Sequence, residues 1–214
     1  MVRAESINIA KNLVAQGKTA GEIWSFFSSF DPETLDLYWK TPRRNITEFI
    51  ETCAKTLPLQ QPVVDVGCGE RSYKPEITDA LGLDVHYIAL DHWIRNSCVN
   101  RSRLLNLVGK AENIPLLDES AGTVICSEVL EHVNDDQKTV REMYRILKAE
   151  GRLVLTLPGR DIPKHEKLPY QIDYRRYGLE QTREILSNCG FLDIQINEKY
   201  LWELQINILV VAKK

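Results

Sequence analysis

The sequence predicts an α/β fold with a mostly parallel, seven-stranded sheet that ends in an antiparallel hairpin. From residue 63 onward, short β-rich runs alternate with helical patterns, which is typical of parallel strands joined by crossover helices. The last two β-rich runs, residues 193–200 and 203–214, are almost adjacent in the chain. No crossover helix fits between strands that close, so these two are expected to pair antiparallel.

Helical patterns dominate the N-terminal part of the chain. Thr19, with Glu22 three residues later, forms the pattern of a capping box ahead of an apolar run. Residues 47–57 give a further amphipathic stretch. We therefore expect an N-terminal helical extension over residues 1–58 and one α/β domain over residues 59–214. The expected strands are residues 63–67, 85–90, 103–108, 122–127, 151–157, 193–200 and 203–214, and the expected helices between them are 73–81, 135–147 and 179–189.

Composition narrows the class of protein. The chain has 214 residues, enough for one hydrophobic core, and a formal net charge of -3. Without a basic excess, a dedicated nucleic-acid partner is not expected. No apolar run is long enough to span a bilayer. The 5 cysteines are scattered without a CxxC pair, which predicts reduced thiols, a cytoplasmic location and no metal site.

A glycine turn follows the first expected strand. Gly67 and Gly69 allow a tight turn and a close approach of a ligand to the backbone, and Asp65 stands two residues before them. The dinucleotide-binding pattern GxGxxG is not met, because residue 72 is Ser. Asp91 ends the next strand, where a carboxylate can accept hydrogen bonds from ribose hydroxyls. The turn therefore predicts an adenosine-containing cofactor.

Together with residues 111–133, 143–159 and 165–191, the glycine turn resembles the class I S-adenosylmethionine-dependent methyltransferases over about residues 60–214. The resemblance implies a Rossmann-like sheet and S-adenosylmethionine as cofactor. It implies that the two glycines line the methionine and ribose, that Asp65 lies near the amino group, and that Asp91 binds the ribose. The implied cofactor-binding set is Asp65, Gly67, Cys68, Gly69, Asp91, Ala111 and Glu112 beside the adenine, and Ser127 and Glu128 under the sulfonium. The alternative for Asp65 is a cap on the glycine turn.

The chain departs from the family pattern at two positions in the cofactor site. Arg71 stands where a third glycine is frequent, although one subgroup with a GCGxxxY turn also lacks that glycine. Lys110 stands where many members carry an aspartate that accepts a hydrogen bond from the adenine amino group. A lysine cannot accept one, so either Glu112 or the backbone is expected to recognise the adenine.

The expected acceptor of the methyl group is a small molecule, a lipid or a glycan-like compound, methylated on oxygen. Methylation of amino groups in DNA usually goes with a [DNS]PP[YF] stretch, and here the corresponding residues read SEVLEH. Cys126 lies in an apolar run and is interpreted as a core thiol rather than a nucleophile. Methyl transfer needs mainly alignment of donor and acceptor, with removal of a proton from a hydroxyl.

The polar residues 158–177 follow the fifth strand and are expected to border the acceptor pocket. His165 is the first candidate for a catalytic base and His132, in the pair Glu131-His132, the second; the alternatives are an exposed loop histidine and a packed helix-start residue. Arg175 and Arg176 are candidates to grip an anionic group of the acceptor, or else ordinary surface charge.

The N-terminal extension is rich in aromatic residues. Its rings either cover the acceptor site or pack the helices onto the sheet or onto a second subunit, as in a homodimer. They are Trp24, Phe26, Phe27, Phe30, Tyr38 and Trp39.

Two other functions stay open: an inactive subunit with a methyltransferase fold, for which Lys110 and Arg71 are the hints, and an NAD-dependent oxidoreductase. The missing third glycine and the antiparallel ending count against the oxidoreductase.

Overall fold

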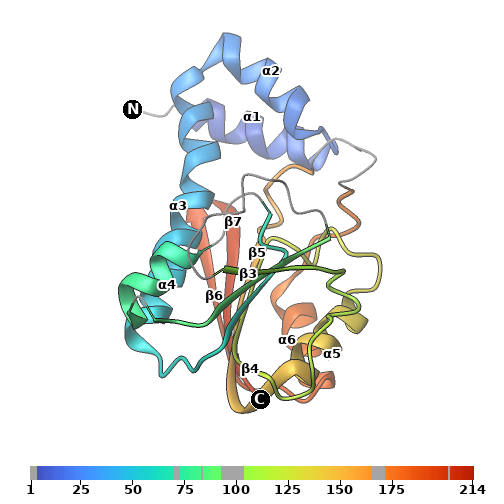
Figure 1. Cartoon of the computed structure of the whole chain (residues 1–214). Helices are drawn as coiled ribbons and strands as arrows, with labels where there is room; N and C mark the ends of the chain where they lie inside the picture. Colours follow the sequence, from blue (N-terminus) through green and yellow to red (C-terminus); the bar gives the residue numbers. More distant parts are fainter. Residues whose placement is uncertain (1–3, 70–72, 83, 93–103, 165–171, 202) are drawn as a thin grey trace.

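A computed structural model describes residues 4–69, 73–82, 84–92, 104–164, 172–201 and 203–214. Seven strands form one sheet in the order β3-β2-β1-β4-β5-β7-β6 (Figure 1). The strands are β1 (Val63–Val66), β2 (Tyr87–Asp91), β3 (Leu104–Val108), β4 (Ala121–Ser127), β5 (Leu147–Pro158), β6 (Leu192–Leu201) and β7 (Leu204–Lys213).

The pairing of the strands confirms the predicted fold class. Strands β1 to β5 pair in parallel with one another, and β7 lies antiparallel between β5 and β6. The largest difference from the expected strands is at β5, which begins at Leu147 rather than Gly151. The chain passes directly from the preceding helix into this strand, whose first residues are too polar to show a strand pattern.

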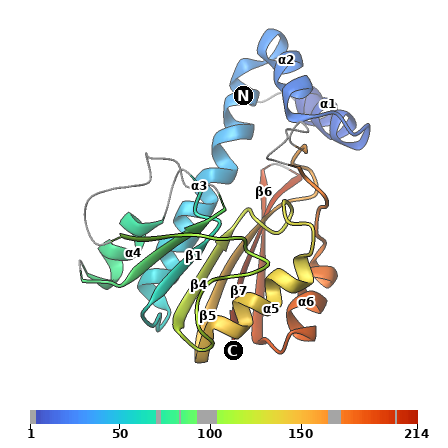
Figure 2. The same cartoon turned by 45° about the vertical axis from the view of Figure 1, so that its right-hand side comes forward.

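Three helices follow strands of the sheet: α4 (Lys74–Leu81), α5 (Asp136–Ile146) and α6 (Leu179–Asn188). Their positions match the expected helices to within one residue at each end. The Asp135 carboxylate accepts a hydrogen bond from the Lys138 amide and caps α5. Figure 2 shows α3 (Pro32–Thr56) and α4 on one face of the sheet and α5 and α6 on the other.

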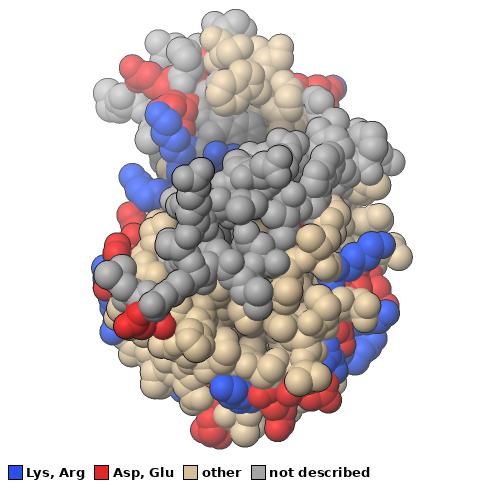
Figure 3. All heavy atoms as spheres, viewed as in Figure 1, with Lys and Arg blue, Asp and Glu red and all other residues tan. Residues whose placement is uncertain are grey.

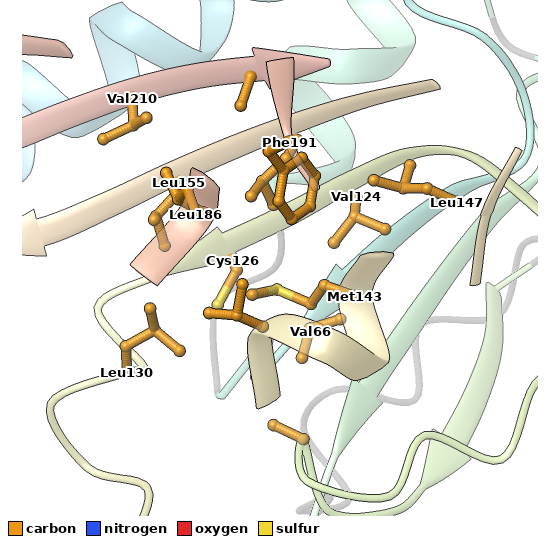
Figure 4. Packing of buried hydrophobic residues seen from close by; sticks show 14 of the residues in the cluster. Val66, Val124, Cys126, Leu130, Met143, Leu147, Leu155, Leu186, Phe191 and Val210 are labelled. Carbon is orange, nitrogen blue, oxygen red and sulfur yellow. The ribbon is translucent and has the colours of Figure 1, made fainter. Parts of the chain in front are cut away.

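Alternate strand residues fill two apolar cores, one on each face. Figure 4 shows Val66, Val124 and Cys126 of the sheet packed near Met143 of α5, and the same cluster includes Leu186 of α6. The opposite face packs its alternate strand residues against α3 and α4. Burial on both faces is what a parallel sheet requires. Cys126 is fully buried, and this burial raises the pKa of its thiol well above the ordinary value, as expected of a core residue.

Helix α3 is longer than the amphipathic stretch that the sequence shows. It continues through Pro42, where a proline costs about 3 kcal/mol in a helix interior. Beyond Pro42, Ile46, Ile50 and Cys53 are buried against the sheet. Each large apolar side chain contributes about 1.5–3 kcal/mol on burial, which is enough to offset the proline.

The first two helices, α1 (Ala4–Ala15) and α2 (Ala20–Phe30), lie at the end of the sheet where the parallel strands finish (Figures 1 and 2). The predicted capping box at Thr19 and Glu22 is present. A small apolar cluster joins these helices to the start of β7: Ala10, Ile23, Phe27, Leu204 and Ile206. The Ala20 amide also donates to the Lys164 carbonyl at 3.0 Å. The extension is therefore attached to the chain that follows β5.

The aromatic residues of the extension have different environments. Phe27 is buried, whereas Trp24 and Phe26 are 51% and 41% exposed. Phe26 packs edge-to-face on Phe27, with the ring centroids 5.4 Å apart, and still leaves part of its ring exposed. The side chains of Phe30, Tyr38 and Trp39 lie outside the described part of the chain.

The boundary between the extension and the α/β domain at residues 58 and 59 stays a prediction. The second half of α3 packs on the sheet, whereas α1 and α2 lie beyond it.

We expect Gly159→Ala to destabilise the protein by about 2–3 kcal/mol, the typical cost of overpacking. A Cβ atom at Gly159 would lie 2.1 Å from the backbone oxygen of Gln205 on β7, and only movement of that strand relieves the clash. The control is Gly178→Ala, whose Cβ would meet no atom within 4 Å and which should cost less than about 1 kcal/mol. Urea denaturation measures both; equal midpoints would contradict the expectation.

Candidate functional site

The turn after β1 is built from backbone that only glycine adopts readily. Gly67 has φ +75°, and its amide and that of Cys68 both donate to the Leu90 carbonyl, at 2.7 and 3.1 Å. A Cβ at Gly67 would lie 2.4 Å from the Val129 side chain. Gly69 has φ +54°, and no atom lies within 4 Å of its Cβ position. The turn is therefore packed at its first glycine and open at its second.

Asp65 is buried beneath this turn. Its Oδ2 atom accepts hydrogen bonds from the Tyr87 hydroxyl at 2.5 Å and from the Tyr73 amide at 3.4 Å. Tyr73 is the N-cap residue of α4, so Asp65 ties β1 to β2 and to the start of α4. These contacts agree with the alternative interpretation as a cap of the turn. Burial raises the pKa of Asp65 to about 7, and the Tyr87 hydrogen bond opposes that rise.

Asp91 ends β2 beside the same turn. Its Oδ2 atom accepts a hydrogen bond from the Gly69 amide at 2.9 Å, and its Oδ1 atom lies 3.1 Å from Nδ1 of His92. Asp91 is 8% exposed as a residue, so its carboxylate is held by the turn and is not a free group at the strand end. The predicted residues Gly67, Gly69 and Asp91 are thus brought together.

The predicted adenine contacts follow β3. The Gly109 amide donates to the Asp91 carbonyl at 3.0 Å, which places this turn beside the end of β2. Ala111 is buried and Glu112 half-buried. Lys110 is exposed, and its backbone forms an isolated antiparallel β-bridge with Asn113. The structure therefore places residues 110–112 next to the ribose-binding candidate.

A chain of hydroxyl groups connects the glycine turn to the ends of β4 and β5. The Tyr73 and Ser127 hydroxyls are 3.0 Å apart, and those of Ser127 and Thr156 are 2.9 Å apart. The Thr156 hydroxyl donates to Oε1 of Glu128 at 3.0 Å. Because a hydroxyl has one proton, Ser127 must then donate to Thr156, and Tyr73 to Ser127. All three hydroxyl groups therefore donate in the same direction, from Tyr73 toward the Glu128 carboxyl.

A second carboxyl group lies near Glu128. Glu131 is 1% exposed, and its Oε2 atom has no hydrogen-bond partner among the described residues. Its other oxygen lies 3.6 Å from Nε2 of His132. Burial raises the pKa of Glu128 to about 8, and the charge of Glu131 adds to this rise. Burial also raises the pKa of Glu131. Such displaced pKa values are typical of functional sites.

His132 is held by the chain that follows β5. Its Nδ1 atom lies 2.9 Å from Oδ1 of Asp173 and 3.2 Å from the Ile172 carbonyl. Burial lowers the pKa of His132, but the hydrogen bond to Asp173 and the charges of Asp173 and Glu131 outweigh it and leave the pKa above its ordinary 6.5. The Asp173 carboxylate thus occupies Nδ1 of His132, and Nε2 lies toward Glu131.

The two arginines have partners within the chain instead of open guanidinium groups. Arg175 donates to the carbonyls of Val133 and Asn134, at 3.0 and 2.8 Å. Arg176 lies 2.7 Å from Oδ2 of Asp173 and also donates to backbone carbonyls. Arg175 therefore holds the chain after β5 against the residues that precede α5, and Arg176 joins residues 162–173 of that chain to one another. These contacts correct the anion-gripping interpretation. His165 lies outside the described residues.

Sequence reasoning missed three residues of this site. Tyr73 was recognised only as part of the turn motif, and neither Thr156 nor Asp173 was singled out. Thr156 is the polar residue within the apolar run 153–157, a signal that was available, and it is fully buried. Asp173 had no such signal, because its partners His132 and Arg176 are set by how the chain folds back.

The described residues offer little support for other kinds of site. They contain no group of three or more side chains that could hold a metal ion. The helices within the described ranges are too short or too polar to cross a lipid bilayer. On the face shown in Figure 3, acidic and basic side chains are interspersed around the lower rim.

We expect Asp65→Asn to change how stability depends on pH. The folded-state pKa of Asp65, about 7, is above its ordinary 3.8, so the folded protein holds a proton that the unfolded chain releases. The native protein therefore loses stability as the pH rises through this interval. Relative to it, the variant should gain about 2 kcal/mol between pH 5 and 7.5. Urea titrations test this, with exposed Asp79→Asn as control; parallel curves would contradict it.

Comparisons with known proteins agree with this geometry. A family model described as a methyltransferase domain matches residues 64–155. A probable S-adenosylmethionine-dependent methyltransferase of Mycobacterium tuberculosis is 29% identical over 142 residues, which cover 62% of this chain and 49% of that protein. The chain spans about half the length of the curated relatives it matches, 55% and 49% of the first two.

Two solved structures show the same fold. A possible histamine N-methyltransferase from Thermotoga maritima has a TM-score of 0.59 at 21% identity and covers 89% of this chain and 99% of that chain. Phosphoethanolamine N-methyltransferase 2 of Haemonchus contortus, in complex with S-adenosyl-L-methionine, has a TM-score of 0.60 at 16% identity and covers 79% and 52%. The sheet, the glycine turn and these matches together support the class I S-adenosylmethionine-dependent methyltransferase superfamily for this chain, with residues 64–155 matching a methyltransferase domain.

Proposed function

We propose that the protein transfers a methyl group from S-adenosylmethionine to a small-molecule acceptor. The observation that carries the proposal is the meeting of the glycine turn, Asp91 and the Ser127-Glu128 pair at one end of the sheet. Ligands of open α/β sheets bind beyond the carboxyl ends of the strands. When bound, S-adenosylmethionine supplies a methyl group that is attached to a positively charged sulfur atom.

The residues of the turn fit such a cofactor. The space beside Gly69 lets a ligand approach the backbone closely, and the Asp91 carboxylate next to it is an acceptor for ribose hydroxyls. Asp65 and Cys68 lie within or below the turn, and we place Ala111 and Glu112 beside the adenine. Ser127 and Glu128, at the end of β4, would lie near the methyl group.

A hydroxyl acceptor must lose a proton, and the hydrogen-bonded hydroxyl groups of Tyr73, Ser127 and Thr156 end at a carboxyl group, Glu128, that can receive it. The sequence predicts oxygen as the methylated atom. Glu128, with a pKa of about 8, is a better proton acceptor near neutral pH than an ordinary glutamate. His132 and His165 remain candidates from the sequence, but Nδ1 of His132 is already held by Asp173, which favours Glu128 in this role.

The surroundings of the site belong to the same proposal. Helices α1 and α2 would cover the acceptor, since they adjoin the chain after β5. The exposed rings of Trp24 and Phe26 would contact either the acceptor or a second subunit of a homodimer. A cytoplasmic location, with reduced thiols, completes the proposal.

S-Adenosylhomocysteine should raise the melting temperature of the native protein, and Asp91→Ala should lose most of that shift. A ligand at one hundred times its Kd stabilises the folded state by about 2.7 kcal/mol. Thermal melts with and without ligand make the measurement, and Asp79→Ala on the exposed side of α4 is the control. Stabilisation by NADH but not by S-adenosylhomocysteine would overturn the proposal.

Lys110→Asp should bind S-adenosylhomocysteine as tightly as the native protein or more tightly. Lys110 is exposed at the predicted adenine end of the site, and aspartate restores an acceptor for the adenine amino group. Calorimetry gives the affinity. A tenfold loss, about 1.4 kcal/mol, would mean that the lysine itself contacts the cofactor.

A further inference from the structure

We propose that the acceptor is an amine, whose ammonium group binds between the carboxyl groups of Glu128 and Glu131. This inference rests on the proposed function and replaces the hydroxyl group predicted from the sequence by a positively charged one. It follows from the unpartnered oxygen of Glu131, from the balance of charges around the two glutamates and from their place at the strand ends.

The unpartnered oxygen is the first observation. Oε2 of Glu131 is buried without a hydrogen-bond donor among the described residues, and Glu131 as a whole is 1% exposed. A buried carboxyl oxygen without a donor is costly to the fold. A bound group with several N–H donors would satisfy it, and an ammonium group has up to three.

The charges around the two glutamates do not balance. The chain after β5 contributes Asp173 and Arg176, whose charges cancel in their 2.7 Å ion pair. His132, held by Asp173, supplies one positive charge at 3.6 Å from Glu131. Arg176 and His132 also act on Glu128 and oppose its raised pKa. With both glutamates ionised, however, three carboxylates face these two cations, and the side-chain donor to Glu128 is the Thr156 hydroxyl. An ammonium ion supplies the missing charge, whereas an alcohol does not.

The position of the two carboxyls suits an acceptor. Both follow β4, and Glu128 is fixed to β5 by its amide hydrogen bond to the Thr156 carbonyl at 3.0 Å. In the proposed cofactor arrangement, this is the end of the sheet where the methyl group is presented. The carboxyls therefore stand where a nucleophile has to be held.

Glu128 also has the proton affinity that amine methylation needs. An ammonium nitrogen has no lone pair until its proton passes to the Glu128 carboxylate, which leaves a neutral amine and a neutral carboxyl. The pKa of Glu128, about 8, is about two units below the pKa of a typical alkylammonium group. The pKa of an ordinary glutamate is about six units below it. With S-adenosylmethionine held by the glycine turn and Asp91, the nitrogen lone pair would form the bond to the methyl carbon, and the carbon–sulfur bond would break with its electron pair left on sulfur.

The test measures binding, not turnover, so it can be performed before the natural acceptor has been identified. Protein saturated with S-adenosylhomocysteine is titrated calorimetrically with ethanolamine, histamine and phenethylamine, each paired with the alcohol that replaces its amino group. We expect at least one amine to bind ten times more tightly than its alcohol. Glu131→Gln and Glu128→Gln should each reduce that preference to threefold or less, and exposed Glu180→Gln should leave it unchanged.

Two results would overturn the inference: no amine preference in the native protein, or a preference that both glutamine variants retain. Far-ultraviolet circular dichroism and melting curves establish that each variant is folded, and glutamine keeps the shape of the side chain. Failure of S-adenosylhomocysteine to bind the native protein would instead refute the proposed function. Binding of S-adenosylhomocysteine without an amine preference would leave the proposed function intact and refute the amine acceptor alone.

Discussion

The hydrogen bond between the Tyr87 hydroxyl and the Asp65 carboxyl holds together the end of the sheet on which the site depends. It joins β1 to β2 beneath the glycine turn, and the Tyr73 amide joins it from the start of α4. The turn above it can then present the Gly69 amide to Asp91. Because Asp65 has no access to water, this arrangement tolerates little change: a lost donor would leave a buried carboxyl unsatisfied.

The same end of the sheet carries carboxyl groups that the fold does not need. Glu128 and Glu131 both have raised pKa values because the surrounding chain withdraws them from water. Apolar residues at these positions would give a more stable protein, since buried ionisable groups rarely repay their desolvation. Their cost to stability is the kind that proteins bear at functional sites. Asp65 differs, because its Oδ2 atom accepts two hydrogen bonds from the fold, whereas the roles that we propose for Glu128 and Glu131 lie in the site.

The elements that the sequence predicted well are those whose signals are local. Seven strands, the capping box at Thr19 and the glycine turn each depend on neighbouring residues. The continuous helix through Pro42 was not predicted, because its stability comes from packing on the sheet. Asp173 was missed and Arg176 misinterpreted for a related reason: a charge is visible in a sequence, but the partner that neutralises it is not.

These distant partners also link the helical extension to the site. The Ala20 amide of α2 binds the Lys164 carbonyl, and Arg176 binds the carbonyl of the neighbouring Pro163. Arg176 in turn holds Asp173, which holds His132 beside Glu131. A shift of α2 would therefore alter the position of the one positive charge nearest to Glu131. Since that charge limits how strongly the carboxyl attracts a cation, we expect displacement of α2 to change the affinity for the proposed acceptor through these contacts.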